Sequence, residues 1–442
     1  MLEKLQVEEN AAWKQRYRAP VVVSTQIASL EPTQGIVAER RDGTQQWYAW
    51  DVPSNELRQI THTPGGHAAQ LTLSPDGRWV YYLDDQQGNE IGHYVRMPAG
   101  GGDLQDITPD LPLYSSWDFS LSRSGNRIGF IAAYEDQFHV FCLDVEEDGT
   151  LGNLRKLYAS PHLLVGLQLS YDGSVLTIMS SERTGRHQFS LVALDSHTGE
   201  KISELWEGEE NSLETMVPSR LPGDPRLLAT TTRTGIETLL IWNPRSGERT
   251  DLALGNVPGA VRAFDWSADG NHILFQTANQ AVHQLYLHDL STGETTPLRH
   301  PDGTNFEPYF RPASDEIFSH WQSSTQPTRL IALSARTGEL VRTVISAGEV
   351  PPGREWKSVS FPSSDGQIIQ GWLAVPDGDG PFPMVIETHG GPTSVQTNSF
   401  VPRAQSWLDH GCAYFSLNYR GSITFGREFE QKIWGQPGHW EI

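Results

Sequence analysis

A histidine, two glycines and a proline, His389-Gly390-Gly391-Pro392, form the stretch of this chain best suited to chemistry. The apolar run at residues 384–386 precedes it and predicts a buried strand. Glycines let the backbone turn sharply after such a strand and leave N–H groups pointing outward. Donors of this kind stabilise the negative charge that develops on a carbonyl oxygen during acyl transfer. Gly390 and Gly391 are therefore candidate oxyanion-hole residues, and the alternative is an ordinary strand-to-helix turn that needs glycine.

A second motif, Asn418-Tyr419-Arg420-Gly421-Ser422, follows about 30 residues later. Arg420 is a candidate substrate contact because its fork of donors suits a carboxylate or carbonyl; a structural ion pair is the alternative. Tyr419 is a second candidate contact, although a core position is the commoner place for a tyrosine in such a motif. The sequence leaves both pairs of alternatives open.

The segment that holds both motifs, residues 349–442, predicts the start of a mostly parallel sheet. We expect a hairpin from residues 356–361 and 368–375, the strand before the glycines, a helix over residues 401–409 and a strand over residues 413–417. A sheet this incomplete is expected to leave an open edge, with the strand at residues 413–417 uncovered. At about 90 residues the segment is shorter than most domains of this type.

Residues 20–348 repeat a strand–turn–strand pattern at a spacing of roughly 45–50 residues, a period typical of propeller blades. Asp-Gly and Ser-Gly turns keep the same spacing and precede apolar strands, which is a hairpin signal. Two hairpins per period make one four-stranded blade. We therefore predict a mainly β protein, with a seven-bladed β-propeller over residues 20–348. The clearest turns of the first kind lie at residues 191–200, 240–248, 285–294 and 330–339, and those of the second at residues 74–77, 122–125, 170–173 and 267–270.

The pattern of residues 1–19 predicts a short amphipathic helix that precedes the propeller. Pro20 is expected to end this helix. Its buried stripe is expected to comprise Leu2, Leu5, Ala12 and Trp13. The N-terminus lacks the apolar core of a signal peptide, and no run is long enough to span a bilayer. We therefore expect a cytoplasmic protein without a membrane partner.

The net charge of −21 argues against nucleic acid as a partner, because phosphate binding needs a basic surface. Only two cysteines, Cys142 and Cys412, are present, so a disulfide scaffold is excluded and buried free thiols are expected. The 15 histidines are scattered without companion ligands at metal spacing, and no phosphate-binding glycine loop occurs. We expect no metal and no cofactor.

In the two motifs and in its order of elements, the chain resembles the prolyl oligopeptidase family of serine peptidases. The likeness is strongest to its acylaminoacyl-peptidase and dipeptidyl-peptidase branches. It covers the whole chain, from the N-terminal helix through the propeller to the opening strands of an α/β-hydrolase domain. The family often has a Thr-Gly-aromatic run where this chain has residues 423–425, a small departure. The resemblance implies that the propeller restricts entry to short peptides, the expected substrates; the oligomeric state, a homo-oligomer included, stays open.

The family pattern further implies a Ser–Asp–His triad with its serine on a Gly-x-Ser-x-Gly turn. That turn is absent, so none of the triad is present in residues 1–442. His389 belongs to the glycine motif and His439 to a glycine-rich loop, and neither is assigned to the triad. We therefore expect a peptidase that releases aminoacyl, acylaminoacyl or dipeptidyl units, with residues 1–442 inactive alone. The alternative is a non-catalytic TolB-like propeller that binds a partner and carries a vestigial hydrolase stub.

Overall fold

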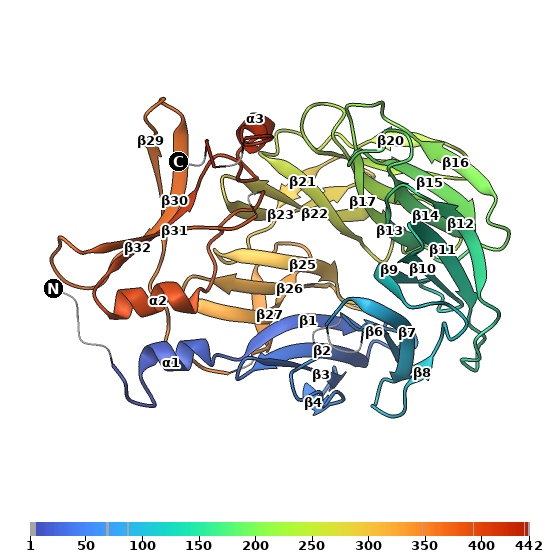
Figure 1. Cartoon of the computed structure of the whole chain (residues 1–442), viewed down its shortest axis with the longest axis horizontal. Coiled ribbons are helices and arrows are strands. Elements are labelled where there is room, and N and C mark those ends of the chain that lie inside the picture. Colours follow the sequence, from blue (N-terminus) through green and yellow to red (C-terminus); the bar gives the residue numbers. More distant parts are fainter. Residues whose placement is uncertain are drawn as a thin grey trace.

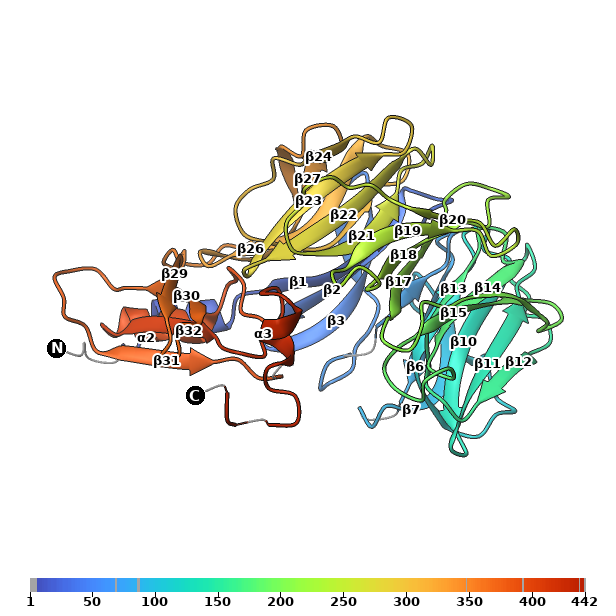
Figure 2. The same cartoon turned by 90° about the horizontal axis from the view of Figure 1, so that it is seen from above.

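The computed structural model describes residues 6–440, apart from residues 68, 69, 86, 87, 347, 392 and 437. Most of this chain folds into antiparallel sheets arranged in a ring, and the C-terminal residues form a smaller unit at one side of it (Figures 1 and 2). We call residues 351–440 the C-terminal unit.

Within the described residues, 28 strands form seven consecutive groups of four, each an antiparallel blade of the predicted propeller. The first strands of most neighbouring blades contact one another, and these strands surround the centre of the ring. Blades 2 and 3 are joined into one sheet because Ile91 and Gly92 of β7 also pair with β9. The first four blades comprise β1 (Val21–Ile27), β2 (Gln34–Arg41), β3 (Thr44–Asp51) and β4 (Glu56–Gln59); β5 (Thr72–Leu73), β6 (Trp79–Asp84), β7 (Ile91–Pro98) and β8 (Gln105–Asp106); β9 (Tyr114–Leu121), β10 (Arg127–Tyr134), β11 (Gln137–Asp144) and β12 (Arg155–Ser160); and β13 (Leu164–Leu169), β14 (Val175–Ser180), β15 (Ser190–Asp195) and β16 (Lys201–Leu205). Blades 5 to 7 comprise β17 (Leu213–Pro218), β18 (Leu227–Thr231), β19 (Thr238–Trp242) and β20 (Arg249–Asp251); β21 (Ala260–Trp266), β22 (His272–Asn279), β23 (Val282–Asp289) and β24 (Thr295–Pro297); and β25 (Thr304–Phe310), β26 (Glu316–Ser323), β27 (Gln326–Ser334) and β28 (Leu340–Ile345).

The repeated Ser-x-Asp-Gly turns show why the sequence pattern marks the blades. In the turn between β5 and β6, Ser74 Oγ donates to Asp76 and accepts a hydrogen bond from the N–H of Trp79 at 2.9 Å. Gly77 has a φ of 74°, in the left-handed region that favours glycine. The same bonds recur at Ser170 and Ser267. The side chains thus close each hairpin locally, which a sequence pattern can reveal.

The C-terminal unit contains a four-stranded sheet in the order β29-β30-β32-β31, in which β31 and β32 are parallel. The helix α2 covers one face, where Trp356, Trp372 and Tyr414 pack with Ala404 and Leu408. The elements are β29 (Lys357–Pro362), β30 (Ile368–Ala374), β31 (Met384–Thr388), α2 (Pro402–Asp409), β32 (Ala413–Asn418) and α3 (Arg427–Gln431). The predicted hairpin, helix and strands are therefore present. The predicted boundary after residue 348 lies between β28 and β29 and stays a prediction.

Two expectations about burial in this sheet were wrong. Met384 and Ile386, expected in a buried strand, are 52% and 64% exposed. The reason is that β31 is an edge strand and that its register with β32 turns only Val385 toward the α2 face. Conversely, residues 413–417 are largely buried, because β32 lies between β30 and β31 beneath α2.

The N-terminal helix is shorter than predicted. The helix α1 spans Ala12–Tyr17, whereas residues 6–11 form turns; Leu2 and Leu5 lie outside the described residues. Ala12 and Trp13 are only half-buried, and the buried residue is Arg16. Its guanidinium pairs with Asp409 at the end of α2 and donates to the carbonyls of Pro351 and Pro352. This helix therefore packs beside α2 on the C-terminal unit (Figure 1).

Among the described residues, no strand is shared between the two ends of the ring, because β1 pairs with β2 and belongs wholly to blade 1. Blades 1 and 7 meet through side chains, among them Val22 and Trp50 against Phe318 and Leu330. Thr25 makes polar contacts across this seam: its Oγ1 lies 3.1 Å from His320 Nε2, in a buried contact, and 3.3 Å from the hydroxyl of Tyr309.

The contact between Thr25 and His320 predicts a loss of stability in acid. Burial lowers the pKa of His320 to about 4. Between pH 6.5 and 4 the unfolded chain therefore binds a proton that the folded chain does not, so stability falls as pH falls, by about 3 kcal/mol for this histidine. Urea unfolding midpoints at several pH values measure it. The variant His320→Gln, which cannot titrate, is expected to flatten this part of the profile; an unchanged profile would contradict the assignment.

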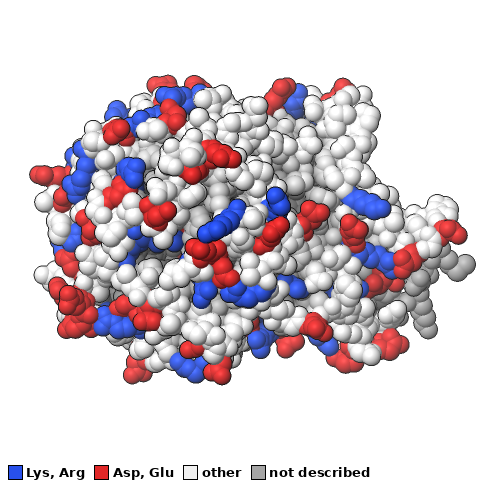
Figure 3. All heavy atoms as spheres, turned by 180° about the vertical axis from the view of Figure 1, so that it is seen from behind, with Lys and Arg blue, Asp and Glu red and all other residues white. Residues whose placement is uncertain are grey.

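Acidic and basic side chains alternate on the face shown in Figure 3. Several basic side chains of the described residues form ion pairs, as Arg183 does with Glu204 at 2.6 Å and Arg233 with Asp251 at 2.9 Å. Acidic and basic side chains are thus interspersed on this face.

Candidate oxyanion site

The glycine turn, residues 389–391, directly follows β31. Gly390 and Gly391 are both exposed, and Gly391 has a φ of 134°. A Cβ added to Gly390 would meet nothing within 4 Å, so space for an approaching group lies in front of it. Among the described residues, neither glycine N–H donates a hydrogen bond. Pro392 lies outside the described residues.

Hydrogen bonds fix the carbonyl groups of this turn, and they thereby fix the direction in which its free N–H groups point. Tyr419 donates its hydroxyl proton to the carbonyl oxygen of His389 at 2.6 Å. His389 Nδ1 lies 3.0 Å from the carbonyl oxygen of Gly390. In a trans peptide the N–H points opposite to the preceding C=O. Fixing the carbonyls of His389 and Gly390 therefore directs the N–H groups of Gly390 and Gly391 away from the loop that holds them.

The protonation of His389 follows from its contacts. Burial lowers the pKa of this histidine, so the ring is neutral at pH 7. A neutral ring has one donor nitrogen and one acceptor nitrogen. Since the Gly390 carbonyl can only accept, Nδ1 carries the proton, and Nε2 accepts from Ser422 Oγ at 2.8 Å. The ring also stacks on Tyr419, with 4.6 Å between ring centroids.

A serine that donates to a histidine resembles part of a catalytic triad, but this pair lacks the other requirements. Ser422 is fully buried, so a substrate carbonyl has no access to its oxygen. His389 Nδ1 faces a backbone carbonyl where a triad has a carboxylate. Ser422 and His389 therefore act as positioning residues for the glycine turn.

The loop at residues 418–424 is itself fixed to the segment after the glycine turn. Asn418 accepts the N–H of Gln396 at 2.8 Å and donates to the carbonyl of Gln396 and the side chain of Gln370. Ile423 donates its N–H to the carbonyl of Ser394 at 3.0 Å. The two motifs thus form one hydrogen-bonded assembly. The sequence did not reveal the roles of Asn418 and Ser422, although both lie in the second motif.

The two candidate substrate contacts lie away from open space. Arg420 is 6% exposed; it pairs with Asp365 of the β29–β30 turn and donates to the carbonyl of Trp440 at 3.3 Å. Tyr419 is 6% exposed, and its hydroxyl is engaged by His389. These placements favour the structural alternative for Arg420 and the core alternative for Tyr419.

Other candidate groups lie apart from this turn. His439 is exposed and contacts the ring of Trp440. Cys142 and Cys412 are buried free thiols, and burial raises the pKa of Cys142 to about 11. Over the described parts of the chain, no group of three or more His, Cys, Asp or Glu side chains is arranged to hold a metal ion. Nor does a described helix have the length and apolar character needed to cross a membrane.

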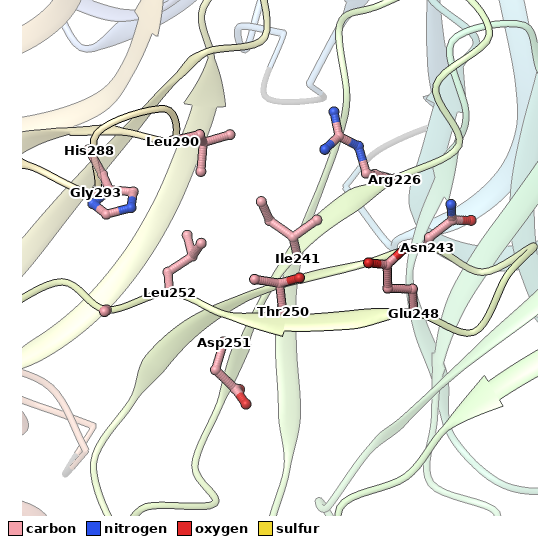
Figure 4. Close-up of a pocket in the computed structure, with 11 residues that line it drawn as sticks. Arg226, Ile241, Asn243, Glu248, Thr250, Asp251, Leu252, His288, Leu290 and Gly293 are labelled. Atoms are coloured by element: carbon pink, nitrogen blue, oxygen red, sulfur yellow. The ribbon is translucent and has the colours of Figure 1, made fainter.

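A pocket of about 350 Å³ lies between blades 5 and 6 (Figure 4). Ile241 and Leu252 face Leu290 across it, with Arg226 and Glu248 at one end and His288 at the other. None of its lining residues belongs to the C-terminal unit. The pocket is therefore separate from the glycine turn.

Comparison with known proteins identifies relatives and structural neighbours, although no protein-family model matches the chain. The acylamino-acid-releasing enzyme of Rattus norvegicus is 22% identical over 192 residues, which are 40% of this chain and 26% of that enzyme. The crystal structure of a puromycin hydrolase superposes with a TM-score of 0.76 at 17% identity, covering 98% of this chain and 71% of that one. A prolyl endopeptidase structure gives a TM-score of 0.75 at 13% identity, covering 96% and 64%.

The fold is therefore the propeller and the first hydrolase strands of the prolyl oligopeptidase architecture. The resemblance to the prolyl oligopeptidase family, which the two motifs predict, is confirmed by these relatives and neighbours. The chain spans about a quarter of the length of the rat enzyme that it matches.

Proposed function

We propose that this chain is part of a serine peptidase that hydrolyses short peptides through an acyl-enzyme. One observation carries the proposal: both glycine N–H groups are free of partners among the described residues, while Tyr419 and His389 hold the carbonyls beside them. The name of the rat relative, an acylamino-acid-releasing enzyme, supports acylaminoacyl peptides as one substrate class. Aminoacyl and dipeptidyl release are the other two.

In this reaction the glycine turn stabilises the oxyanion of the tetrahedral intermediate. Its donors are fixed before the substrate binds, so they need no reorganisation as charge develops, and one such donor lowers the barrier by roughly 3–4 kcal/mol. The neutral ring of His389 holds the turn and takes no proton from substrate. A nucleophile, a general base and its carboxylate partner must come from elsewhere, because residues 1–442 contain no Gly-x-Ser-x-Gly turn.

Purified residues 1–442 are therefore expected not to hydrolyse chromogenic aminoacyl, acylaminoacyl or dipeptidyl amides. The same amides are assayed with the native gene product, whose intact mass is compared with 49.3 kDa. Turnover by residues 1–442 that increases with protein concentration would contradict the proposal. A native product of 49.3 kDa without turnover would favour the alternative, a non-catalytic TolB-like propeller.

Two glycine variants in an active native product test the role of the turn. Gly391→Ala places a side chain where φ is 134° and displaces the donor, so kcat/KM is expected to fall roughly 10²–10³-fold, mainly through kcat. Gly390→Ala places its methyl group in the open space in front of the turn, where a substrate would approach, so a loss of kcat/KM is expected there as well. Equal, small effects of both variants would argue for an ordinary turn.

A further inference from the structure

The hairpin of β22 and β23 in blade 6 ends in a two-residue turn that inserts into the C-terminal unit. Gln280 and Ala281 have φ values of 48° and 64°, so both N–H groups point out of the hairpin. Thr424 accepts both, the first with its carbonyl oxygen and the second with Oγ1, each at 2.9 Å. Ala281 is 1% exposed and packs with Trp356 and Trp372 of the C-terminal unit. The turn is thus a specific docking contact between propeller and C-terminal unit.

Thr424 accepts these bonds in an unusual conformation. Its φ is 76°, and the left-handed region is a true outlier for a β-branched residue. Such residues persist only where surrounding contacts fix them. The bonds from blade 6 supply that constraint, and without them a negative φ is the favoured state. Docking therefore stabilises a backbone conformation that this residue would otherwise disfavour.

The same residue adjoins the groups that hold the glycine turn. Ile423, its neighbour, donates its N–H to Ser394 at 3.0 Å, and Ser422 donates to His389. Among the described residues, hydrogen bonds from blade 7 end elsewhere: for example, Thr304 donates to the carbonyl of Asn398, and Gln322 accepts the N–H of Phe400. Blade 6 is therefore positioned to act on the loop at residues 418–424, and blade 7 on the segment after the glycine turn.

We propose that the blade 6 turn is a latch that sets the loop at residues 418–424 and, through Ser422 and His389, the orientation of the Gly390 and Gly391 N–H groups. The glycine turn is then competent to bind an oxyanion only while the propeller is docked. This regulation rests on the proposed function of the turn, but the coupling itself is a property of residues 1–442.

The test uses the 442-residue chain with labelled histidine and NMR titration of His389, assigned with His389→Gln. Thr424→Val removes the Oγ1 acceptor and disfavours the left-handed φ. We expect the pKa of His389 to rise toward its ordinary value, and the amides of Ser422 and Ile423 to exchange hydrogen at least about tenfold faster. Thr424→Ser retains both acceptors and is expected to behave as the wild type. Gln322→Ala removes a blade 7 contact and is expected to leave His389 unchanged.

A Thr424→Val chain with normal His389 titration and unchanged exchange at Ser422 would overturn the latch, and so would an equal shift in Gln322→Ala. If Thr424→Val does not fold, Thr424→Ala replaces it, since alanine lacks Oγ1 and its Cβ still disfavours a φ of 76°. The expected result and the two results that would overturn the latch stay the same for this variant. No readout depends on hydrolysis, so failure of the proposed function leaves this test valid.

Discussion

Replacing Asp265 by alanine is expected to cost about 3–5 kcal/mol of folding stability, because it leaves a buried cation without its partner. The carboxylate of Asp265 is 3% exposed and pairs with Arg220, which is 13% exposed. It also accepts the N–H of Phe310 at 2.9 Å and lies 3.7 Å from Arg123. Arg123 and Arg220 follow the first strands of blades 3 and 5, and Asp265 and Phe310 lie at the ends of the first strands of blades 6 and 7. One carboxylate therefore joins four blades at the centre of the ring.

Chemical denaturation of Asp265→Ala beside Asp251→Ala measures this effect. Asp251 is also paired with arginines but is 49% exposed, and removing such a pair typically costs less than about 1 kcal/mol. The double variant Asp265→Ala/Arg220→Met is expected to recover part of the loss, since it removes the uncompensated cation. A loss for Asp265→Ala no larger than for Asp251→Ala would show that the buried pair does not hold the blades.

The variant Gly421→Ala is expected to destabilise the C-terminal unit by about 2–5 kcal/mol, from backbone strain and overpacking together. Gly421 has a φ of 100°, and an added Cβ would lie 2.3 Å from Cδ1 and 2.8 Å from Cγ1 of Ile433. Ile433 is 3% exposed and β-branched, so it has little freedom to move aside. The displaced loop carries Ser422, so the bond to His389 is expected to break as well.

Gly426→Ala separates the two contributions. Gly426 has a φ of 94°, but a Cβ there would meet nothing within 4 Å, so only backbone strain remains. Hydrogen exchange across β30 and β32 measures the stability of the C-terminal unit in both variants. Equal losses of stability in the two variants would mean that Ile433 accommodates the methyl group. Backbone strain alone would then explain why glycine is required at position 421.

The propeller could be predicted from the sequence because its turns are local. Ser74, Asp76 and Gly77 lie within four residues and close their hairpin by themselves, and the same pattern recurs in other blades. The length of α1 was misjudged because tertiary contacts decide it: Arg16 binds Pro351 and Asp409, far along the chain. The burial of β31 was misjudged because an apolar run does not show whether a strand lies at the centre or the edge of its sheet.

The candidate site also has one part that could be predicted from the sequence and one part that could not. The glycines at 390 and 391 are visible in the sequence because exposed backbone donors need residues without side chains. The partners that aim these donors are not visible, because the bond from Ser422 to His389 spans 33 residues and the bond from Tyr419 spans 30. The structure brings the two motifs together, so that Tyr419, a candidate substrate contact, lies where its hydroxyl group supports the glycine turn.

The absence of a shared strand at the ring closure has a consequence for the order of folding. Each blade pairs strands that are consecutive in the chain, so it can form as soon as its own segment has been synthesised. The seam is different, since Thr25 and His320 are 295 residues apart and meet only after all seven blades exist. We therefore expect the seam to form last during synthesis, and blade 1 to wait with an apolar flank exposed until blade 7 arrives.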